Sequence, residues 1–141
     1  MPPAIPGVRG ADTRAALLAL AAGYRARFAG LTAVAVTGSV GKTTTKDVIA
    51  HLVAGERTTI ASQKSFNNSV GVPLTVLGVS RASEVLVAEL GASETGSIDR
   101  LAGAVGPDHG VITAVREAHL EGFGSLERVR AAKGELLGHV R

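Results

Sequence analysis

Aliphatic runs alternate along the chain with segments whose apolar residues recur at helical spacing. Four of these runs predict β-strands, at residues 31–37, 58–61, 84–90 and 109–115. The helical spacing predicts a helix that begins near Asn68 and further helices at residues 11–28, 43–54, 97–105 and 125–140. Uninterrupted aliphatic runs are typical of parallel strands that are covered on both faces. The alternation therefore predicts an α/β fold with a doubly wound, mostly parallel sheet and flanking helices.

Local signals refine the ends of these elements. Asp12 or Thr13 is expected to cap the first helix, and Gly55 is expected to end the second helix in a left-handed conformation. Prolines are concentrated in the first ten residues. The sequence therefore predicts a flexible lead-in at residues 1–10 and a folded domain at residues 11–141.

Composition excludes several classes of function. Hydrophobic residues make up 45% of the chain and aromatic residues 3%, so the core must be built from Val, Leu, Ile and Ala. The net charge of +3 is scattered, without the basic and aromatic stripe that stacks on nucleic acid. No apolar run reaches the roughly 18 residues of a membrane span. The absence of cysteine excludes disulfides and thiolate metal sites and fits a reducing cytoplasm.

A candidate phosphate loop follows the first predicted strand. Residues 38–44 read GSVGKTT and lead directly into the second predicted helix. Glycines let backbone N–H groups turn inward, the helix N-terminus adds positive potential, and Lys42 would reach the terminal phosphates. Thr43 places a hydroxyl where Mg²⁺ would sit beside those phosphates. The predicted nucleotide-binding residues of this P-loop-type segment are Gly38, Ser39, Val40, Gly41, Lys42, Thr43 and Thr44.

An ordinary strand-to-helix turn with a solvent-exposed Lys42 is the alternative interpretation. The context favours the phosphate loop, because a predicted strand precedes it and a predicted helix follows it. Val36 stands where the full Walker pattern has its first glycine. The loop is therefore the shorter G-x-x-G-K-T form.

Polar residues also occur after two later strands. Asn67 and Asn68 lie in a predicted loop, where their amides could donate to phosphate oxygens or hold metal-bound water. Asparagine is also a good helix cap, so each residue could serve one of these purposes. Glu89 lies at the carboxyl end of a predicted strand, where ligands bind in open α/β sheets. Because Mg²⁺ takes carboxylate oxygens, Glu89 is a candidate metal ligand, the alternative being a simple turn residue.

Four segments resemble, in the same order, motifs of the Mur ligases, and the first of them also resembles the ATP loop of their relatives, the folylpolyglutamate and cyanophycin synthetases. They read TGSVGKTTTK from Thr37, FNNSVGVP from Phe66, ELGA from Glu89 and AHLEGFGS from Ala118. The second and fourth strings most resemble the branch of the family that adds D-Ala-D-Ala to a UDP-MurNAc-tripeptide. The resemblance covers roughly residues 16–137, which is nearly the whole chain.

This resemblance implies an ATP-dependent amide ligase, in which a carboxylate is converted to an acyl phosphate that an amine then attacks. ATP and Mg²⁺ are the implied cofactors, and UDP-MurNAc-peptide and D-Ala-D-Ala are the implied substrates. The implied catalytic residues are Lys42, His119 and Lys133, and the implied metal ligands are Thr43, Glu89, His119 and Lys133. Lys133 matches the family lysine that CO₂ carbamylates, whereas residue type alone would make it an ordinary solvated lysine. His119 would lie near a second Mg²⁺, although a lone histidine more often caps a helix or packs.

The chain departs from the family pattern just before the fourth string. The family usually has an asparagine there, followed two residues later by a small residue and often by proline. This chain has Ala114, Arg116 and Glu117 at these positions. These different residues are expected to affect the conformation of the loop that carries His119.

Mur ligases have three domains, and residues 11–141 would form part of the central, ATP-binding domain. The N-terminal substrate domain and the C-terminal ligase domain would be absent, so these residues alone are expected to be inactive. Two alternatives stay open: a nucleotide-binding module without ligase activity, and a cyanophycin or folylpolyglutamate synthetase relative. We expect a monomer that binds neither nucleic acid nor membrane.

Overall fold

A computed structural model describes residues 11–116 and 123–141, and the bounds of its elements are as follows. The strands are β1 (Thr32–Thr37), β2 (Thr59–Ala61), β3 (Val85–Glu89) and β4 (His109–Ile112). The helices are α1 (Thr13–Arg25), α2 (Lys42–Ala54), α3 (Gly71–Leu77), α4 (Ser97–Val105), α6 (Leu126–Gly134) and the 3₁₀ helix η1 (Glu135–Gly138). None of the helices in this part of the chain is long and apolar enough to span a membrane.

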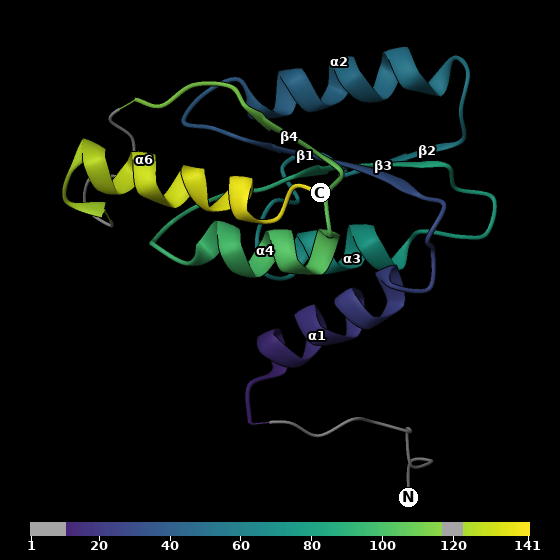
Figure 1. The fold of residues 1–141 in the computed structure, drawn as a ribbon, viewed down its shortest axis with the longest axis horizontal. Coiled ribbons are helices and arrows are strands. Elements are labelled where there is room, and N and C mark those ends of the chain that lie inside the picture. The colour runs from purple at the N-terminus through teal and green to yellow at the C-terminus, as the bar shows by residue number, and fades with distance from the viewer. Residues whose placement is uncertain (1–10, 117–122) are drawn as a thin grey trace, which may run out of the picture.

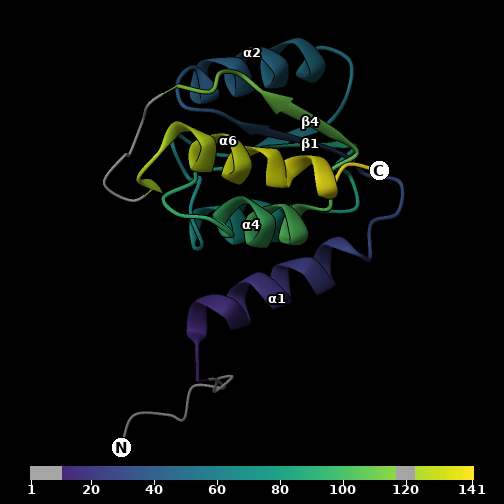
Figure 2. The ribbon, with the colours of Figure 1, turned by 60° about the vertical axis from the view of Figure 1, so that its left-hand side comes forward.

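The strands form one parallel sheet in the order β2-β3-β1-β4. Helix α2 covers one face of the sheet, and α3 and α4 cover the other (Figure 1). Helix α1 packs on α3 and α4, outside the layer that they form (Figure 2). The predicted fold class, a doubly wound parallel α/β sheet, is confirmed.

Alternation of side chains along β1 and β3 divides the core into two layers, one on each face of the sheet. The layer under α3 and α4 contains Ala33, Ala35, Leu86 and Ala88. The layer under α2 contains Val34, Val36, Val85 and Val87. Glu89 has the same parity as Val85 and Val87, so its side chain lies on the α2 face, where the phosphate loop opens.

The observed helix ends agree with the sequence-based expectation for α1 but differ from it for α2 and α6. Asp12 caps α1, because its carboxylate accepts from the N–H groups of Arg14 and Ala15 at 2.9 and 3.0 Å. The left-handed end predicted at Gly55 is wrong: its φ is −66°, and the chain continues in a right-handed turn. The last helix is also shorter than predicted, since α6 ends at Gly134 and tightens into η1.

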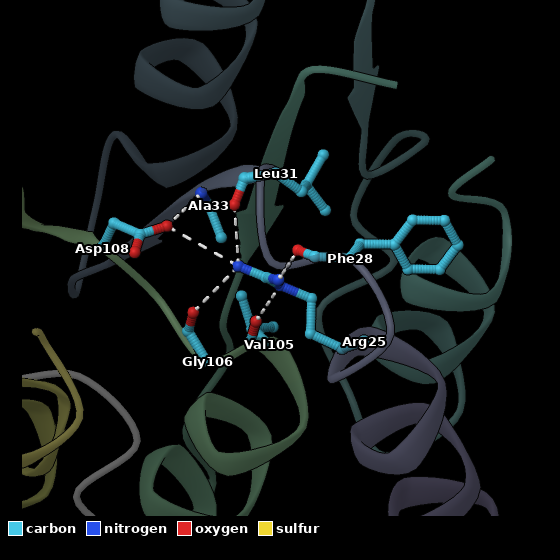
Figure 3. Close-up of polar contacts among 7 residues, drawn as sticks. All are labelled: Arg25, Phe28, Leu31, Ala33, Val105, Gly106 and Asp108. Atoms are coloured by element: carbon cyan, nitrogen blue, oxygen red, sulfur yellow. Dashed lines mark hydrogen bonds and ion pairs between the residues drawn. The ribbon is translucent and has the colours of Figure 1, made fainter. Parts of the chain in front are cut away.

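A buried arginine fixes α1 to the amino-terminal edge of the sheet (Figure 3). Arg25 is 5% exposed, and its guanidinium lies 3.6 Å from the carboxylate of Asp108. It also donates to the backbone carbonyl oxygens of Phe28, Leu31 and Val105 at 2.8–3.0 Å. Asp108 in turn accepts from the backbone N–H of Ala33 at 2.7 Å. These contacts join α1, α4 and the starts of β1 and β4, at the edge opposite the phosphate loop.

Candidate functional site

The phosphate loop joins β1 to α2 and requires glycine at two positions. Gly38 has φ of 149° and Gly41 has φ of 80°, conformations that other residues rarely adopt. A Cβ added at Gly38 would lie 2.0 Å from the hydroxyl of Thr113, so the space is also closed. Gly41 caps α2 without a side-chain hydrogen bond. The first N–H groups of α2 therefore face the loop as potential anion donors.

Lys42 begins α2 and crosses the loop. Its Nζ donates to the carbonyl oxygen of Gly38 at 2.9 Å. A lysine in this position can exchange that carbonyl for a phosphate oxygen with a small movement of a flexible side chain. The structure thus places Lys42 where the sequence predicts the ligand of the terminal phosphates.

The segment after β4 braces the other side of the loop. Thr113 donates through its hydroxyl to the carbonyl oxygen of Val40 at 2.6 Å. The N–H of Ser39 donates to the carbonyl oxygen of Ala114 at 2.8 Å, and the Ser39 hydroxyl bonds both backbone groups of Arg116. Ala114 and Arg116 thus meet the loop through backbone atoms. Their departure from the family pattern therefore leaves these bracing contacts intact.

Glu89 lies at the carboxyl end of β3 and is 1% exposed. Its Oε2 accepts from the hydroxyl of Thr43 at 2.8 Å, and its Oε1 accepts from the side-chain amide of Asn67 at 2.7 Å. Both carboxylate oxygens are therefore held in place by neutral donors. Three residues that the sequence singled out separately thus meet at one point beside the phosphate loop.

The two adjacent asparagines have different surroundings. Asn67 is clamped to the end of β3, because its carbonyl oxygen also accepts from the N–H of Gly91 at 2.7 Å. A Cβ at Gly91 would lie 2.9 Å from the Asn67 side chain, so this approach requires glycine. The side chain of Asn68 instead accepts from the N–H groups of Val70 and Gly71, at 3.0 and 2.9 Å, at the start of α3. The geometry favours a site role for Asn67 and a capping role for Asn68.

Lys133 is a buried residue in the last turn of α6, with 3% of its surface exposed. Burial lowers the pKa of Lys133, and the positive charge of Lys42 lowers this pKa further. Phe123, Val129 and Ala132 form a small apolar cluster with Ala92, and two members of this cluster belong to the same helix as Lys133.

The predicted ligand His119 lies outside the described residues. The other histidines lie elsewhere: His51 and His109 are exposed on α2 and β4, and His139 pairs with Asp99 at 2.8 Å. Within residues 11–116 and 123–141, no group of three or more His, Asp or Glu side chains is placed to hold a metal ion. Among the described residues, the candidate metal position therefore rests on Glu89 and Thr43.

Sequence reasoning missed three residues that shape this site: Lys46, Ser62 and Thr113. The Ser62 hydroxyl accepts from the backbone N–H of Glu89 at 3.1 Å, and Lys46 is a residue of α2 that is 2% exposed. A signal for Lys46 was available, because it follows Lys42 by four residues and Thr43 by three, which makes it a neighbour of each of them on the helix surface. No local pattern marks Ser62 or Thr113, since their contacts are far apart in sequence.

Residues 36–141 match the family model of the Mur ligase middle domain. The chain belongs to the Mur ligase family. It is 41% identical over 131 residues to the UDP-N-acetylmuramoyl-tripeptide--D-alanyl-D-alanine ligase of Bacillus subtilis, a match that covers 92% of this chain and 28% of that ligase. The resemblance inferred from the four motifs is confirmed.

Solved structures agree with this assignment. The fold matches a crystal structure of MurF from Acinetobacter baumannii with a TM-score of 0.90 and 37% identity, over 93% of this chain and 29% of that one. It also matches the MurF ligase from Thermotoga maritima in complex with ADP, with a TM-score of 0.85 and 34% identity, over 97% of this chain and 33% of that one. This Mur ligase chain therefore spans about a third or less of the length of these relatives.

Proposed function

We propose that the chain is the ATP-binding part of a Mur ligase that adds D-Ala-D-Ala to UDP-MurNAc-tripeptide during peptidoglycan precursor synthesis. The observation that carries the proposal is the 2.8 Å contact between Thr43, at the phosphate loop, and the buried carboxylate of Glu89. The B. subtilis relative bears the name of this activity, and a structural neighbour holds ADP. These likenesses favour it over a cyanophycin or folylpolyglutamate synthetase.

The residues present fit Mg²⁺ and ATP. A hydroxyl and a carboxylate are hard oxygen ligands of the kind Mg²⁺ takes, and Mg²⁺ usually keeps several waters and binds substrate phosphates as well. Glu89 is buried, and its carboxylate is oriented by donors from Thr43 and Asn67. The metal would supply positive charge beside the transferring phosphoryl group.

The reaction transfers the γ-phosphoryl group of ATP to a carboxylate oxygen, and an amine then displaces phosphate from the acyl carbon to form the amide. Lys42 and the first N–H groups of α2 would stabilise negative charge on the phosphoryl oxygens. Thr43 and Glu89 would hold the metal, which would supply positive charge to the same phosphoryl group. Lys133, as a carbamate, and His119 would hold a second metal.

Replacing Lys42 with alanine is expected to weaken Mg·ATP binding by roughly 10- to 100-fold, because a charge-assisted hydrogen bond contributes about 1.5–3 kcal/mol. Isothermal titration calorimetry on the intact protein would measure this effect. Arg57→Ala, which removes an exposed cation after α2, is the matched control and should bind like the wild type. Equal affinity of the wild type and Lys42→Ala for Mg·ATP would contradict the assignment of residues 38–44 as a phosphate loop.

A polypeptide of these 141 residues alone is expected to form no amide. Catalysis of this kind depends on positioning, and the matched ligase of B. subtilis is several times longer, since the match covers 28% of it. Phosphate release would be assayed with UDP-MurNAc-tripeptide and D-Ala-D-Ala present. Substrate-dependent turnover by the 141 residues would contradict this, whereas ATP binding without turnover agrees with it.

A further inference from the structure

Lys46 is a buried cation that the proposed chemistry does not use. It lies on α2, one turn beyond Thr43, and is 2% exposed. Its Nζ donates to the carbonyl oxygen of Ser62 at 2.7 Å and lies 2.6 Å from the Asp47 carboxylate. A third contact, at 3.4 Å, reaches the carbonyl oxygen of Lys64. Burying an ammonium is costly, so an apolar side chain would fill this space more cheaply if packing were its sole purpose.

The partners of Lys46 begin the loop that approaches Glu89. Ser62 extends β2 beside β3, since its N–H donates to the carbonyl oxygen of Val87 at 3.0 Å and its hydroxyl accepts the N–H of Glu89 at 3.1 Å. Lys64 has φ of 48°, a conformation that residues other than glycine rarely adopt. Such a conformation persists where its surroundings hold it, and the Lys46 ammonium is one of the groups that do so.

The end of the same loop carries Asn67. The carbonyl oxygen of Asn67 accepts from Gly91, and its amide donates to Glu89, both at 2.7 Å. Residues 62–67 therefore contact α2 through Ser62 and contact the end of β3 through Asn67. Thr43 and Lys46 both belong to α2. This helix therefore fixes the positions of both donors to the Glu89 carboxylate: Thr43 is part of the helix, and Asn67 lies on the loop that Lys46 holds.

We propose that Lys46 is a positioning residue for Mg·ATP, which acts by holding residues 62–67 so that Asn67 fixes the Glu89 carboxylate. The inference rests on the proposed function and adds to it a residue that touches neither the nucleotide nor the metal. Groups that orient a metal ligand typically affect metal affinity by about 10- to 100-fold when they are removed. Loss of Lys46 should therefore act on the metal-dependent part of nucleotide binding.

The test compares Mg·ATP with metal-free ATP by calorimetry on the intact protein. Lys46→Met is expected to weaken Mg·ATP binding by about tenfold and to leave metal-free ATP binding within about twofold. Asn67→Ala should have the same signature. The double variant should be no more than about twofold weaker than Asn67→Ala, because both residues act on one carboxylate. Arg57→Met removes an exposed positive charge outside this loop and should match the wild type.

Three outcomes would overturn the proposal: unchanged Mg·ATP affinity in Lys46→Met, equal weakening with and without metal, or additive losses in the double variant. Thermal unfolding in metal-free buffer checks that each variant is folded. If Lys46→Met does not fold, Lys46→Gln keeps one N–H donor and must still lose Mg·ATP affinity selectively, by about threefold or more. A wild type that binds no Mg·ATP would overturn the proposed function as well. Normal binding that depends on Lys42 but not on Lys46 would overturn this inference alone.

Discussion

Replacing Glu89 with glutamine is expected to reduce ligation by the intact enzyme by about 10³-fold. A metal that stabilises charge on a transferring phosphoryl group contributes several kcal/mol, and each 1.4 kcal/mol is a factor of ten in rate. Glutamine has nearly the same shape but no charge, and its amide nitrogen would face a donor, either Thr43 or Asn67. Phosphate release with saturating substrates would measure the loss.

The effect of Glu89→Gln on the affinity for ATP should differ between metal-free buffer and buffer with Mg²⁺. Without metal, the buried carboxylate repels the phosphates, so the variant should bind metal-free ATP as well as the wild type or more tightly. With Mg²⁺, the variant should gain little or nothing from the metal. Glu56→Gln, which changes an exposed carboxylate after α2, is the control and should keep the wild-type response. A normal Mg²⁺ response in Glu89→Gln would rule out Glu89 as the ligand.

The sequence predicted most of the sheet because its strands are aliphatic and buried on both faces. The observed β1 starts one residue later than predicted, and the observed β3 is one residue shorter than predicted at each end. The prediction ran too far for β4, which ends at Ile112 instead of residue 115, because Thr113 turns to hold the phosphate loop. Hydrophobicity along the chain carries no sign of that contact, since its partner Val40 is more than seventy residues away.

Some residues of the candidate site could also be predicted from the local sequence, whereas others depend on contacts between residues far apart in the sequence. Thr43 and Glu89 were predictable because each follows a parallel strand, and the carboxyl ends of such strands meet at one edge of the sheet. Lys46 and Lys133 were not predictable from residue type, because a lysine on a helix is usually solvated. Lys46 is buried because its ammonium donates to the carbonyl oxygens of Ser62 and Lys64, which lie far from it in sequence, and Lys133 is 3% exposed on a helix of otherwise mostly exposed residues.

Replacing Lys133 with alanine is expected to abolish ligation in the intact enzyme while Mg·ATP binding stays within about threefold of wild type.

CO₂ reacts with a neutral amine: a bond forms between Nζ and the carbon, and one proton is released. Burial, and then the charge of Lys42, lower the pKa of Lys133, so more of the neutral amine is present near neutral pH than for an exposed lysine. Carbamate formation should therefore rise as pH increases through this lowered pKa. The product is an anion that suits a metal and is attracted to Lys42, whereas a protonated Lys133 would repel both.

Carbon-13 NMR of the intact enzyme in labelled bicarbonate measures the carbamate without reference to activity. We expect a carbamate resonance in the wild type and its loss in Lys133→Ala. Lys42→Met should shift its appearance to higher pH, because removing that positive charge raises the pKa of Lys133. Small carboxylates such as formate or acetate should partly restore ligation to Lys133→Ala, since they can occupy the space of the lost group. Arg130→Ala, an exposed change on the same helix, is the control and should ligate normally. Full activity of Lys133→Ala would show that ligation does not need a carbamate at this position. A wild type without the resonance at any pH would show that the carbamate does not form.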